Sequence, residues 1–491
     1  MIRMVCCVFA FSVLMGTQVA LAQYDGATSV PEKYVTGFQS ITEGDSRELL
    51  TRLIAEDFSG RGTGQEGYLN AARWVAGNLE AWGFQPAGPD GSWYQNVPFI
   101  RVSVDAEKTA LRLGDEILSD GDQFGIAHFV GTFDKQLPVT FAAIPNSRKQ
   151  PEIKEGQFAG QLLVIRGRLE GNEAFLSRGN PECVLIAVDE ARIRTESVSR
   201  LEQTPLPTPV AKISLTAASK LAERCGVQGE LFTGESPDQP IFVASSVVAH
   251  ASVSVVRESM DVPNVVGWYP GSDETVNDEY IGIGAHLDHL GVQRDQVFPG
   301  ADDNGSGSAA ILQMAKAIHL GDTKPRRSVL FMAFCAEERG LLGSKFYCEN
   351  PVRPLDKMIC MLNIDMIGRN EETADEAASE NENTIHLVGS QLASEEMHET
   401  VMDANKYVNF VFEYDEEKRV AMRSDQASFA AKGVPVTFLF GGFNPHYHKT
   451  TDTLDGINFG KIANAARLNY LTLMFASEHG HFKKKPAVAA E

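Results

Sequence analysis

Residues 280–289 read Tyr280-Ile281-Gly282-Ile283-Gly284-Ala285-His286-Leu287-Asp288-His289. The first six are apolar or small without a polar alternation, which is typical of a strand buried on both faces, and polar residues follow where the strand ends. Further continuous apolar runs at 328–336, 357–364 and 434–440 alternate with helical patterns such as 306–320. This alternation predicts an α/β domain whose sheet is covered by helices on both faces.

Two helical patterns precede this region, at 46–58 and 69–82. A glycine-rich turn lies between them, Ser59-Gly60-Arg61-Gly62-Thr63-Gly64. It lacks the Lys-Ser/Thr and the preceding strand of a phosphate-binding loop, so we expect a plain connecting loop. From about 105 to 255 short β-type runs are separated by Pro and Gly. This stretch predicts a separate, mostly β domain inserted into the α/β domain.

The chain has 491 residues, enough for more than one domain, and a formal net charge of −21. This acidity argues against a general nucleic-acid or anionic-membrane partner. Residues 1–22 combine an early cation, an apolar stretch and Ala20-Leu21-Ala22, which is typical of a cleaved signal peptide. Since no later run is apolar for long enough to span a bilayer, we expect a secreted or periplasmic protein with no membrane span in its mature chain.

Five cysteines follow the predicted signal peptide: Cys183, Cys225, Cys335, Cys348 and Cys360. None belongs to a C-x-x-C pair, so cysteine ligation of a metal ion is not expected. A Cys183–Cys225 disulfide is compatible with the sequence, but their spacing alone does not predict it.

Residue types that bind metal ions stand at or just after five predicted strand ends or turns. They are His286-Leu287-Asp288-His289, Gly300 to Gly307, Glu337-Glu338, Asp365, and His446-Tyr447-His448 with Asp452. Ligands of open α/β sheets bind at the carboxyl ends of the strands, so we expect these side chains to converge on one cleft. A lone His or a Glu pair is usually structural or solvated, but a buried cluster of carboxylates needs cations to offset it. Two histidines with three carboxylates are a donor set suited to zinc.

With these motifs in this order, the sequence resembles the secreted di-zinc exopeptidases of the aminopeptidase Y, bacterial leucyl aminopeptidase and glutamate carboxypeptidase group. The motifs are Gly284 to His289, Pro299 to Gly307, Ala336 to Ser344, Leu362 to Gly368 and Tyr447 to Thr453. Residues 45–95 also resemble the first helices of bacterial members, and Gly160–Gly167 with Pro207–Ser214 resemble a protease-associated domain. The resemblance implies a mixed central β-sheet sandwiched by helices, the zinc-exopeptidase fold, with an inserted mostly β protease-associated domain.

The resemblance also implies domain boundaries. They are a signal peptide at 1–22, a discontinuous catalytic domain at 31–104 plus 256–480, a protease-associated-like domain at 105–255 and a flexible tail at 481–491.

Two zinc ions per chain are implied, with a ligand set for each. His286 and Asp365 bind one ion, His448 and Glu338 bind the other, and Asp303 bridges the two. The bond between Asp303 and Asn304 is often cis in the family. Two such ions about 3.5–4 Å apart can hold and activate one water, which gives this arrangement a chemical purpose.

The catalytic residues that the resemblance implies are Glu337 as general base, Asp288 to orient His286, and Tyr447 to stabilise the oxyanion. A carboxylate beside a metal ligand is well placed to take a proton from the water and pass it to the leaving amine. The second ring nitrogen of a ligating histidine needs a partner, which an Asp two residues along can provide.

Some assignments have competitors. His446 competes with His448, although only His448 stands in the Tyr-His-x-x-x-Asp-Thr pattern, and Asp302 competes with Asp303. His289 is expected to support the site or its loop. Arg423-Ser424-Asp425 resembles a family segment near the substrate pocket, where Gln426 replaces the usual histidine.

The sequence therefore predicts an extracytoplasmic zinc-dependent exopeptidase that acts on peptides, in the first place as an aminopeptidase. A carboxypeptidase on the same centre is an alternative and would need cations such as Arg369 and Arg423 for the terminal carboxylate. A metal-free receptor-like protein and a single-zinc cyclase-type relative are further alternatives on this scaffold.

Overall fold

The computed structural model describes residues 23–126, 132–145, 152–167, 173–199, 208–293, 295–414 and 421–483. The predicted signal peptide at 1–22, and the predicted tail from 484 onward, lie outside the described residues. The chain divides into two compact units. The first, Met1–Gln95 with Pro263–Glu491, is called the α/β unit here, and the second, Asn96–Val262, is called the β unit.

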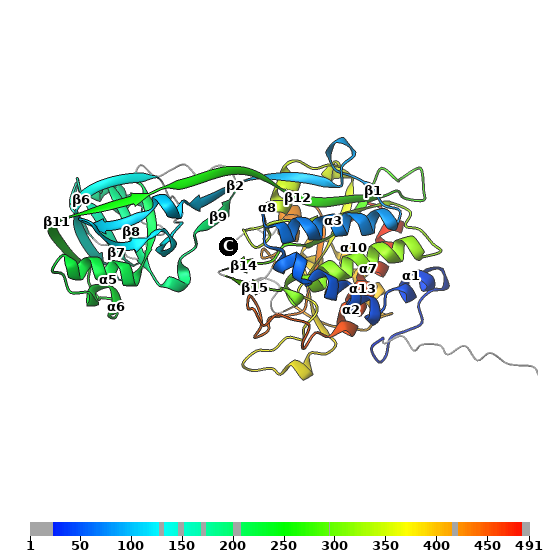
Figure 1. Ribbon diagram of the computed structural model, residues 1–491. Coiled ribbons are helices and arrows are strands. Elements are labelled where there is room, and N and C mark those ends of the chain that lie inside the picture. Colours follow the sequence, from blue (N-terminus) through cyan, green and yellow to red (C-terminus); the bar gives the residue numbers. More distant parts are fainter. Residues whose placement is uncertain are drawn as a thin grey trace, which may run out of the picture. The chain divides into compact units, whose positions relative to one another are not determined.

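A mixed sheet forms the centre of the α/β unit (Figure 1). Its strands lie in the order β19-β18-β20-β17-β13-β16-β12. Their bounds are β12 Val255–Tyr269, β13 Tyr280–His286, β16 Ser328–Phe334, β17 Met358–Asp365, β18 Thr384–Val388, β19 Val411–Glu413 and β20 Val436–Phe440, and the short β1 Gln85–Pro86 pairs with β12. β13 is parallel to β16 and β17, and β17 is parallel to β20. β12 and β18 run antiparallel to their neighbours β16 and β20.

The central strands are buried along their whole length, as their continuous apolar sequences predict. Every residue of β13, β16, β17 and β20 is buried. Other elements must pack on both faces of a sheet of such strands, because either face would otherwise expose hydrophobic side chains to water.

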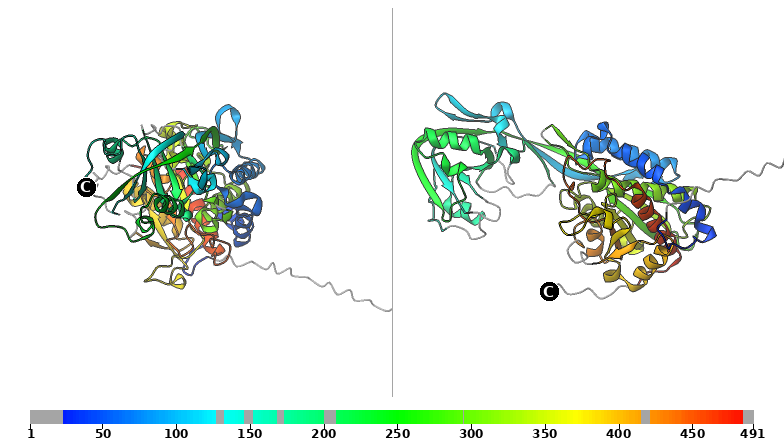
Figure 2. Two further views of the ribbon diagram at one scale, coloured as in Figure 1. Left: turned by 60° about the vertical axis from the view of Figure 1, so that its left-hand side comes forward. Right: turned by 90° about the horizontal axis from the view of Figure 1, so that it is seen from below.

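Helices supply that cover (Figures 1 and 2). On one side α7, α13, α1, α2, α3 and α10 pack together, and α7 and α13 also contact β13 and β17. On the other, α8 and α12 pack against each other, and α12 contacts β17 and β20. The bounds are α1 Val35–Ser40, α2 Glu43–Leu53, α3 Glu66–Ala81, α7 Gly307–Leu320, α8 Leu342–Glu349, α9 Ser390–Ala393, α10 Glu395–Asn405, α12 Gln426–Ala431 and α13 Phe459–Glu478. The predicted fold class is therefore confirmed.

Local sequence explains where several of these helices begin. The hydroxyls of Thr42 and Ser394 accept the N–H groups of Asp45 and Met397 at the starts of α2 and α10. The Asn458 side chain does the same for α13. These caps satisfy donors that the helix itself cannot. α7 is buried from Gly307 to Ile318 except at Lys316, which is expected of a helix that is apolar on most sides.

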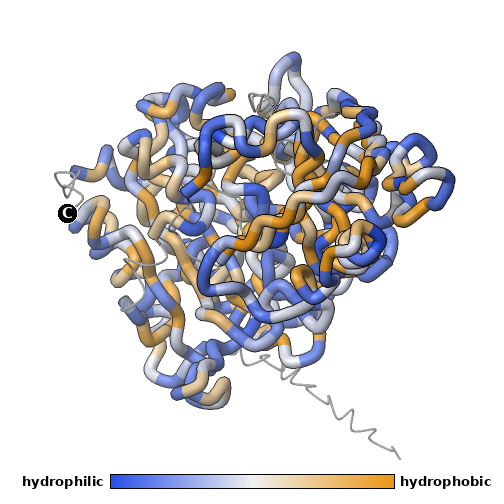
Figure 3. The backbone as a smooth tube through the Cα atoms, turned by 90° about the vertical axis from the view of Figure 1, so that its left-hand side faces the viewer, coloured by the Kyte–Doolittle hydropathy of each residue, from blue (hydrophilic) through white to orange (hydrophobic). Residues whose placement is uncertain are grey.

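The β unit has its own sheet of strands in the order β4-β3-β11-β6-β7-β8-β10-β5. The bounds are β3 Ala110–Leu113, β4 Glu116–Asp120, β5 Phe124–Gly125, β6 Phe133–Ala143, β7 Leu162–Arg166, β8 Cys183–Val188, β10 Val210–Ser214 and β11 Ile241–Val253. β2 Tyr94–Val104 pairs with β9 Glu196–Ser199, and the helices are α4 Glu173–Gly179, α5 Leu215–Arg224 and α6 Glu230–Thr233. Along the backbone, hydrophobic stretches alternate with hydrophilic ones (Figure 3). The inserted region is thus mostly β, as predicted.

Two further expectations can be compared with the structure. All five cysteines that follow residue 22 are free, so Cys183 and Cys225 form no disulfide. None of the helices in the described part of the chain combines the length and the apolarity needed to cross a bilayer.

Candidate metal centre

The predicted ligands lie at the carboxyl ends of the parallel strands in the α/β unit. His286 is the last residue of β13 and Asp365 the last of β17. Glu338 follows β16, His448 follows β20, and Asp303 lies in the turn Ala301–Ser306 that leads into α7. Because these strands are parallel neighbours, their ends meet at one edge of the sheet, and the structure brings all five side chains together.

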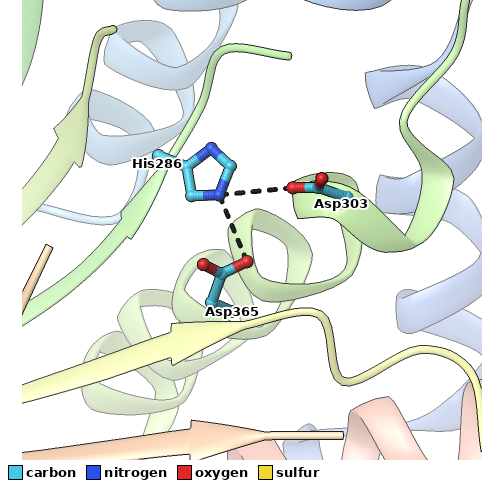
Figure 4. Close-up of side chains that lie close together, drawn as sticks. All are labelled: His286, Asp303 and Asp365. Atoms are coloured by element: carbon cyan, nitrogen blue, oxygen red, sulfur yellow. Dashed lines mark hydrogen bonds and ion pairs between the residues drawn. The ribbon is translucent and has the colours of Figure 1, made fainter. Parts of the chain in front are cut away.

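His286 forms one group with two carboxylates. Its Nε2 atom lies 3.1 Å from Asp365 Oδ1 and 3.4 Å from Asp303 Oδ1. Figure 4 shows both carboxylates turned toward the same ring nitrogen. The three residues are buried, and their donor atoms are close enough to share one metal ion.

His448 forms a second group around the same aspartate. Its Nε2 atom lies 3.1 Å from Asp303 Oδ2 and 3.1 Å from Glu338 Oε2. The two oxygens of Asp303 therefore face two different histidines, as a bridging carboxylate must. The peptide bond from Asp303 to Asn304 is cis.

The competing residues are engaged elsewhere. Asp302 Oδ1 accepts the N–H groups of Gly368 at 2.7 Å and Arg369 at 3.2 Å, and its Oδ2 accepts the Asn444 amide. The ring of His446 contacts the Thr451 hydroxyl at 2.9 Å. This geometry favours Asp303 and His448 as the donors.

His289 is closer to the centre than its sequence position suggested. The ring is fully buried, and Nδ1 lies 2.8 Å from Glu338 Oε1 and 3.7 Å from Asp303 Oδ2. His289, Asp303 and Glu338 form a further group able to hold an ion. His448 reaches Glu338 from the pocket side, whereas His289 reaches it from the interior. The signal in the sequence was a second histidine three positions after the first.

The side chains of Glu337 and Glu338 point in different directions because the chain makes a sharp turn before them. The predicted strand 328–336 ends at Phe334, and Ala336 has a φ of 55°, in the left-handed region. The chain therefore turns immediately after β16. Glu338 then lies between His289 and His448, while Glu337 lines the neighbouring pocket.

Asp288 holds His286 through its main chain rather than its carboxylate. The Asp288 carbonyl accepts a hydrogen bond from His286 Nδ1 at 2.9 Å, whereas the nearest carboxylate oxygen lies 3.8 Å away. The carboxylate instead accepts the Glu337 N–H at 3.1 Å and the Thr63 hydroxyl at 2.7 Å.

The tautomer of His286 follows from this contact. A carbonyl oxygen can only accept, so Nδ1 carries the proton and Nε2 of the neutral ring presents a lone pair. That lone pair faces the carboxylates of Asp303 and Asp365. Three electron-rich groups in one buried space require a cation between them, either a proton or a metal ion.

The carboxylates show the same need for cations. Burial raises the pKa of Asp288 to about 6, and burial together with the charge of Glu338 raises that of Asp303. Burial also raises the pKa of Glu337 well above its usual range. In addition, both ring nitrogens of His289 and Oε1 of Glu338 are buried, and although Nδ1 lies 2.8 Å from Oε1, the two are not aligned for a hydrogen bond. The nitrogen and oxygen donors present fit divalent metal ions such as zinc.

A pocket opens beside these residues, with about 390 Å³ of empty space that includes solvent at its open mouth. It is lined by Asp303, Glu337, Asp365, Met366, Arg423, Ser424, Phe438, Phe440, Phe443, Tyr447 and His448. The Tyr447 ring stacks on that of His448 with centroids 3.9 Å apart and packs against Phe443. A small molecule in this pocket can therefore touch three of the candidate ligands, Asp303, Asp365 and His448, together with Glu337 and Tyr447.

Glu371, His386 and Glu413 form a separate cluster of donor atoms. His386 Nε2 lies at hydrogen-bonding distance from Glu371 Oε2, 2.8 Å, and 3.4 Å from Glu413 Oε2. Glu371 Oε1 accepts the N–H of Phe443 at 3.3 Å. These contacts tie the cluster to the pocket wall, where it supports Phe443.

The sequence is similar to proteins of known class. Residues 264–473 match the model of peptidase family M28. Leucine aminopeptidase 2 of Arthroderma otae is 28% identical over 278 residues, which are 49% of this chain and 52% of that protein. Leupeptin-inactivating enzyme 1 of Streptomyces exfoliatus is 30% identical over 216 residues, covering 40% of this chain and 44% of that protein. The chain spans about half the length of the curated relatives it matches.

Solved structures share the fold. The aminopeptidase from Aneurinibacillus sp. strain AM-1 has a TM-score of 0.54 at 18% identity, covering 92% of this chain and 97% of that one. BSAP, a zinc aminopeptidase from Bacillus subtilis, has a TM-score of 0.56 at 18% identity, covering 91% and 95%. These likenesses show the same fold, and the stretch 264–473, which holds the five strand-end motifs, is similar to peptidase family M28.

Proposed function

We propose that this protein is a zinc-dependent exopeptidase that removes N-terminal residues from peptides. The observation that carries the proposal is the position of Asp303, whose two carboxylate oxygens face two separate pairs of a histidine and a carboxylate. A pocket opens directly beside them.

Two ions per chain would be held by the predicted ligands. His286, Asp365 and Asp303 would hold one, and His448, Glu338 and Asp303 the other, with His289 also in contact with Glu338. Zinc bound there would polarise the scissile carbonyl and supply a water that ionises near neutral pH.

Glu337 is the proposed general base and acid. It lines the pocket, and burial raises its pKa, so it can hold a proton between taking it from the attacking water and giving it to the departing amine. Asp288 fixes the main chain at this residue through the N–H of Glu337.

Tyr447 is the proposed donor to the oxyanion. Burial and the nearby carboxylates of Asp303, Glu338 and Asp365 raise the pKa of its hydroxyl. The group therefore stays protonated at neutral pH and can donate to a carbonyl oxygen as negative charge develops on it.

A carboxypeptidase would need a cation that is free to pair with the terminal carboxylate of its substrate. Arg369, a cation that a carboxypeptidase would need, is buried and donates to Asp452 Oδ1 at 3.1 Å and to the Thr453 carbonyl at 2.8 Å. Arg423 remains at the pocket, over the ring of Phe443.

The remaining assignments are part of the proposal. The β unit would be a protease-associated-type domain at about 105–255, inserted into a catalytic domain at 31–104 plus 256–480. Residues 1–22 would direct the protein to the periplasm or the exterior, where its substrates would be peptides.

A two-part experiment on the purified full chain tests the function. Elemental analysis should find about two zinc ions per chain, since two donor groups share Asp303. Leucine p-nitroanilide should be hydrolysed, and its N-acetylated form should not. Absence of zinc and turnover would instead support a receptor-like protein. One zinc ion would support a cyclase-type relative, and release of C-terminal residues from an N-acetylated peptide would support a carboxypeptidase.

A further inference from the structure

We propose that the glycine-rich turn Gly60–Gly64 is a positioning element for the metal centre, and that Arg61 and Thr63 set how tightly the centre holds its ions. The inference rests on the proposed function, because it concerns the same ions. Neither residue lines the pocket, so both would act through the loops that they hold.

The guanidinium of Arg61 joins the two loops that carry His286 and Asp303. The side chain is fully buried. Nε donates to the carbonyl of Leu287 at 2.8 Å, directly after His286, and Nη2 donates to that of Gly300 at 2.8 Å, just before the Asp303 turn. Nη1 donates to Leu53 at 2.8 Å and Pro299 at 3.0 Å. One rigid planar group therefore spans both loops.

The turn also holds three consecutive residues after His286. Arg61 Nε holds the Leu287 carbonyl, the Thr63 hydroxyl holds the Asp288 carboxylate at 2.7 Å, and the carbonyl of Arg61 accepts the N–H of His289 at 3.1 Å. Arg61 and Thr63, which lie outside the metal centre, therefore set the orientation of residues 287–289.

Close packing explains the glycines on either side. Gly60 has a φ of 67°, and a Cβ there would lie 2.0 Å from the carbonyl oxygen of Phe298. A Cβ on Gly62 would lie 2.9 Å from Gly291 Cα. Only glycine lets the turn approach both sides of the loop that follows β13 closely enough for Arg61 and Thr63 to reach it.

Charge adds to the geometry. Arg61 is the buried cation whose field reaches Asp303, Asp288 and Glu338. It offsets part of their repulsion without occupying the space between them. The carboxylates are therefore held near one another before an ion arrives, which lowers the cost of ordering them on binding.

Two conservative variants of the full chain test the inference, each with a matched control. Arg61→Lys keeps the charge but cannot span four carbonyls. Its control is Arg467→Lys, because Arg467 is also buried and donates to the Ile41 carbonyl at 2.7 and 3.1 Å, an acceptor outside the loops that carry the ligands. Thr63→Val removes only the hydroxyl. Its control is Thr472→Val, where a buried hydroxyl donates to the Leu468 carbonyl at 2.9 Å.

The readouts are the zinc dissociation constant, measured by competition with a chromophoric chelator, and the unfolding temperature of the zinc-free protein. Arg61→Lys and Thr63→Val should each weaken zinc binding by at least about tenfold, the usual effect of losing an outer partner of a ligand. Arg467→Lys and Thr472→Val should lower the unfolding temperature but leave the dissociation constant unchanged.

Equal zinc affinity in Arg61→Lys, Thr63→Val and the unmodified protein would overturn the inference and leave the proposed function standing. No zinc binding by the unmodified protein would overturn both. If Arg61→Lys does not fold, Thr63→Val decides alone, since valine has nearly the shape of threonine.

Discussion

The carboxylate of Asp288 accepts the main-chain N–H of Glu337 at 3.1 Å, across 49 positions of sequence. The contact joins the loop after β13 to the turn after β16. Through it, the residue proposed to move protons is held by the same loop that carries His286. His286, Asp288 and Glu337 are therefore linked in a single hydrogen-bonded unit.

Replacing Asp288 with Asn tests this connection. The amide removes the negative charge and keeps only one oxygen acceptor, so the charge-assisted hydrogen bond to the Glu337 N–H weakens and the Thr63 hydroxyl must turn to accept from the amide NH2. We expect kcat to fall by about 10- to 100-fold with little change in KM, because the substrate does not touch Asp288. Steady-state kinetics on leucine p-nitroanilide measure this, and an unchanged kcat would contradict the role.

Glu337→Gln should leave zinc bound but lower turnover by at least about a hundredfold, since glutamine cannot accept the proton of the water. Elemental analysis and kinetics on the same sample separate the two effects. Glu399→Gln, at an exposed position of α10, is the matched control and should keep full activity. Near-normal turnover in Glu337→Gln would refute its assignment as the base.

Removal of zinc with dipicolinate should abolish activity, and adding zinc back should restore it. Zinc should also raise the unfolding temperature, because a ligand that binds only the folded state stabilises it by about 4 kcal/mol at a thousand times its dissociation constant. Differential scanning calorimetry with and without zinc measures the shift. Activity that survives complete removal of the metal would exclude the proposed mechanism.

Arg423→Ala should separate the two directions of peptide cleavage. For an aminopeptidase we expect kcat/KM on leucine p-nitroanilide to change less than about tenfold, because this substrate has no carboxylate to pair with Arg423. A carboxypeptidase would lose a charge-paired contact of about 2–5 kcal/mol. A collapse of N-terminal hydrolysis in Arg423→Ala would show that the arginine does more than line the pocket.

Lys461 makes stability depend on pH. Burial lowers its pKa to about 8, so between pH 8 and its ordinary value the unfolded chain holds a proton that the folded protein has released. The unfolding free energy should therefore rise with pH in this window, by about 2 kcal/mol from pH 7.5 to 9.5. Lys461→Met should lack this increment. Urea unfolding of the unmodified protein and of Lys461→Met, both zinc-free, at the two pH values measures this difference. An equal change in unfolding free energy in the two proteins would contradict the lowered pKa of Lys461.

Much of the sheet could be predicted because burial leaves a local pattern. The runs 280–285, 328–336, 357–364 and 434–440 match strands β13, β16, β17 and β20 to within two residues at each end. The positions of the candidate ligands followed from the same pattern, because each stands at a strand end or in a turn.

What the sequence did not predict depends on contacts between distant segments. Arg61 and Leu287 are 226 positions apart, and Thr63 and Asp288 are 225 apart. Contacts between residues so far apart produce no repeating pattern in the sequence. The glycine-rich turn Gly60–Gly64 was therefore expected to be a plain connecting loop. The proximity of His289 to Glu338 was missed for the same reason. So was the contact of His286 with a main-chain carbonyl, since carbonyls carry no residue identity.

The shared carboxylate of Asp303 has a consequence for how the centre fills. Its two oxygens already face His286 and His448 before any ion is bound. An ion at either histidine therefore draws on the negative charge of the same carboxylate that the other ion would use, so the two sites do not fill independently.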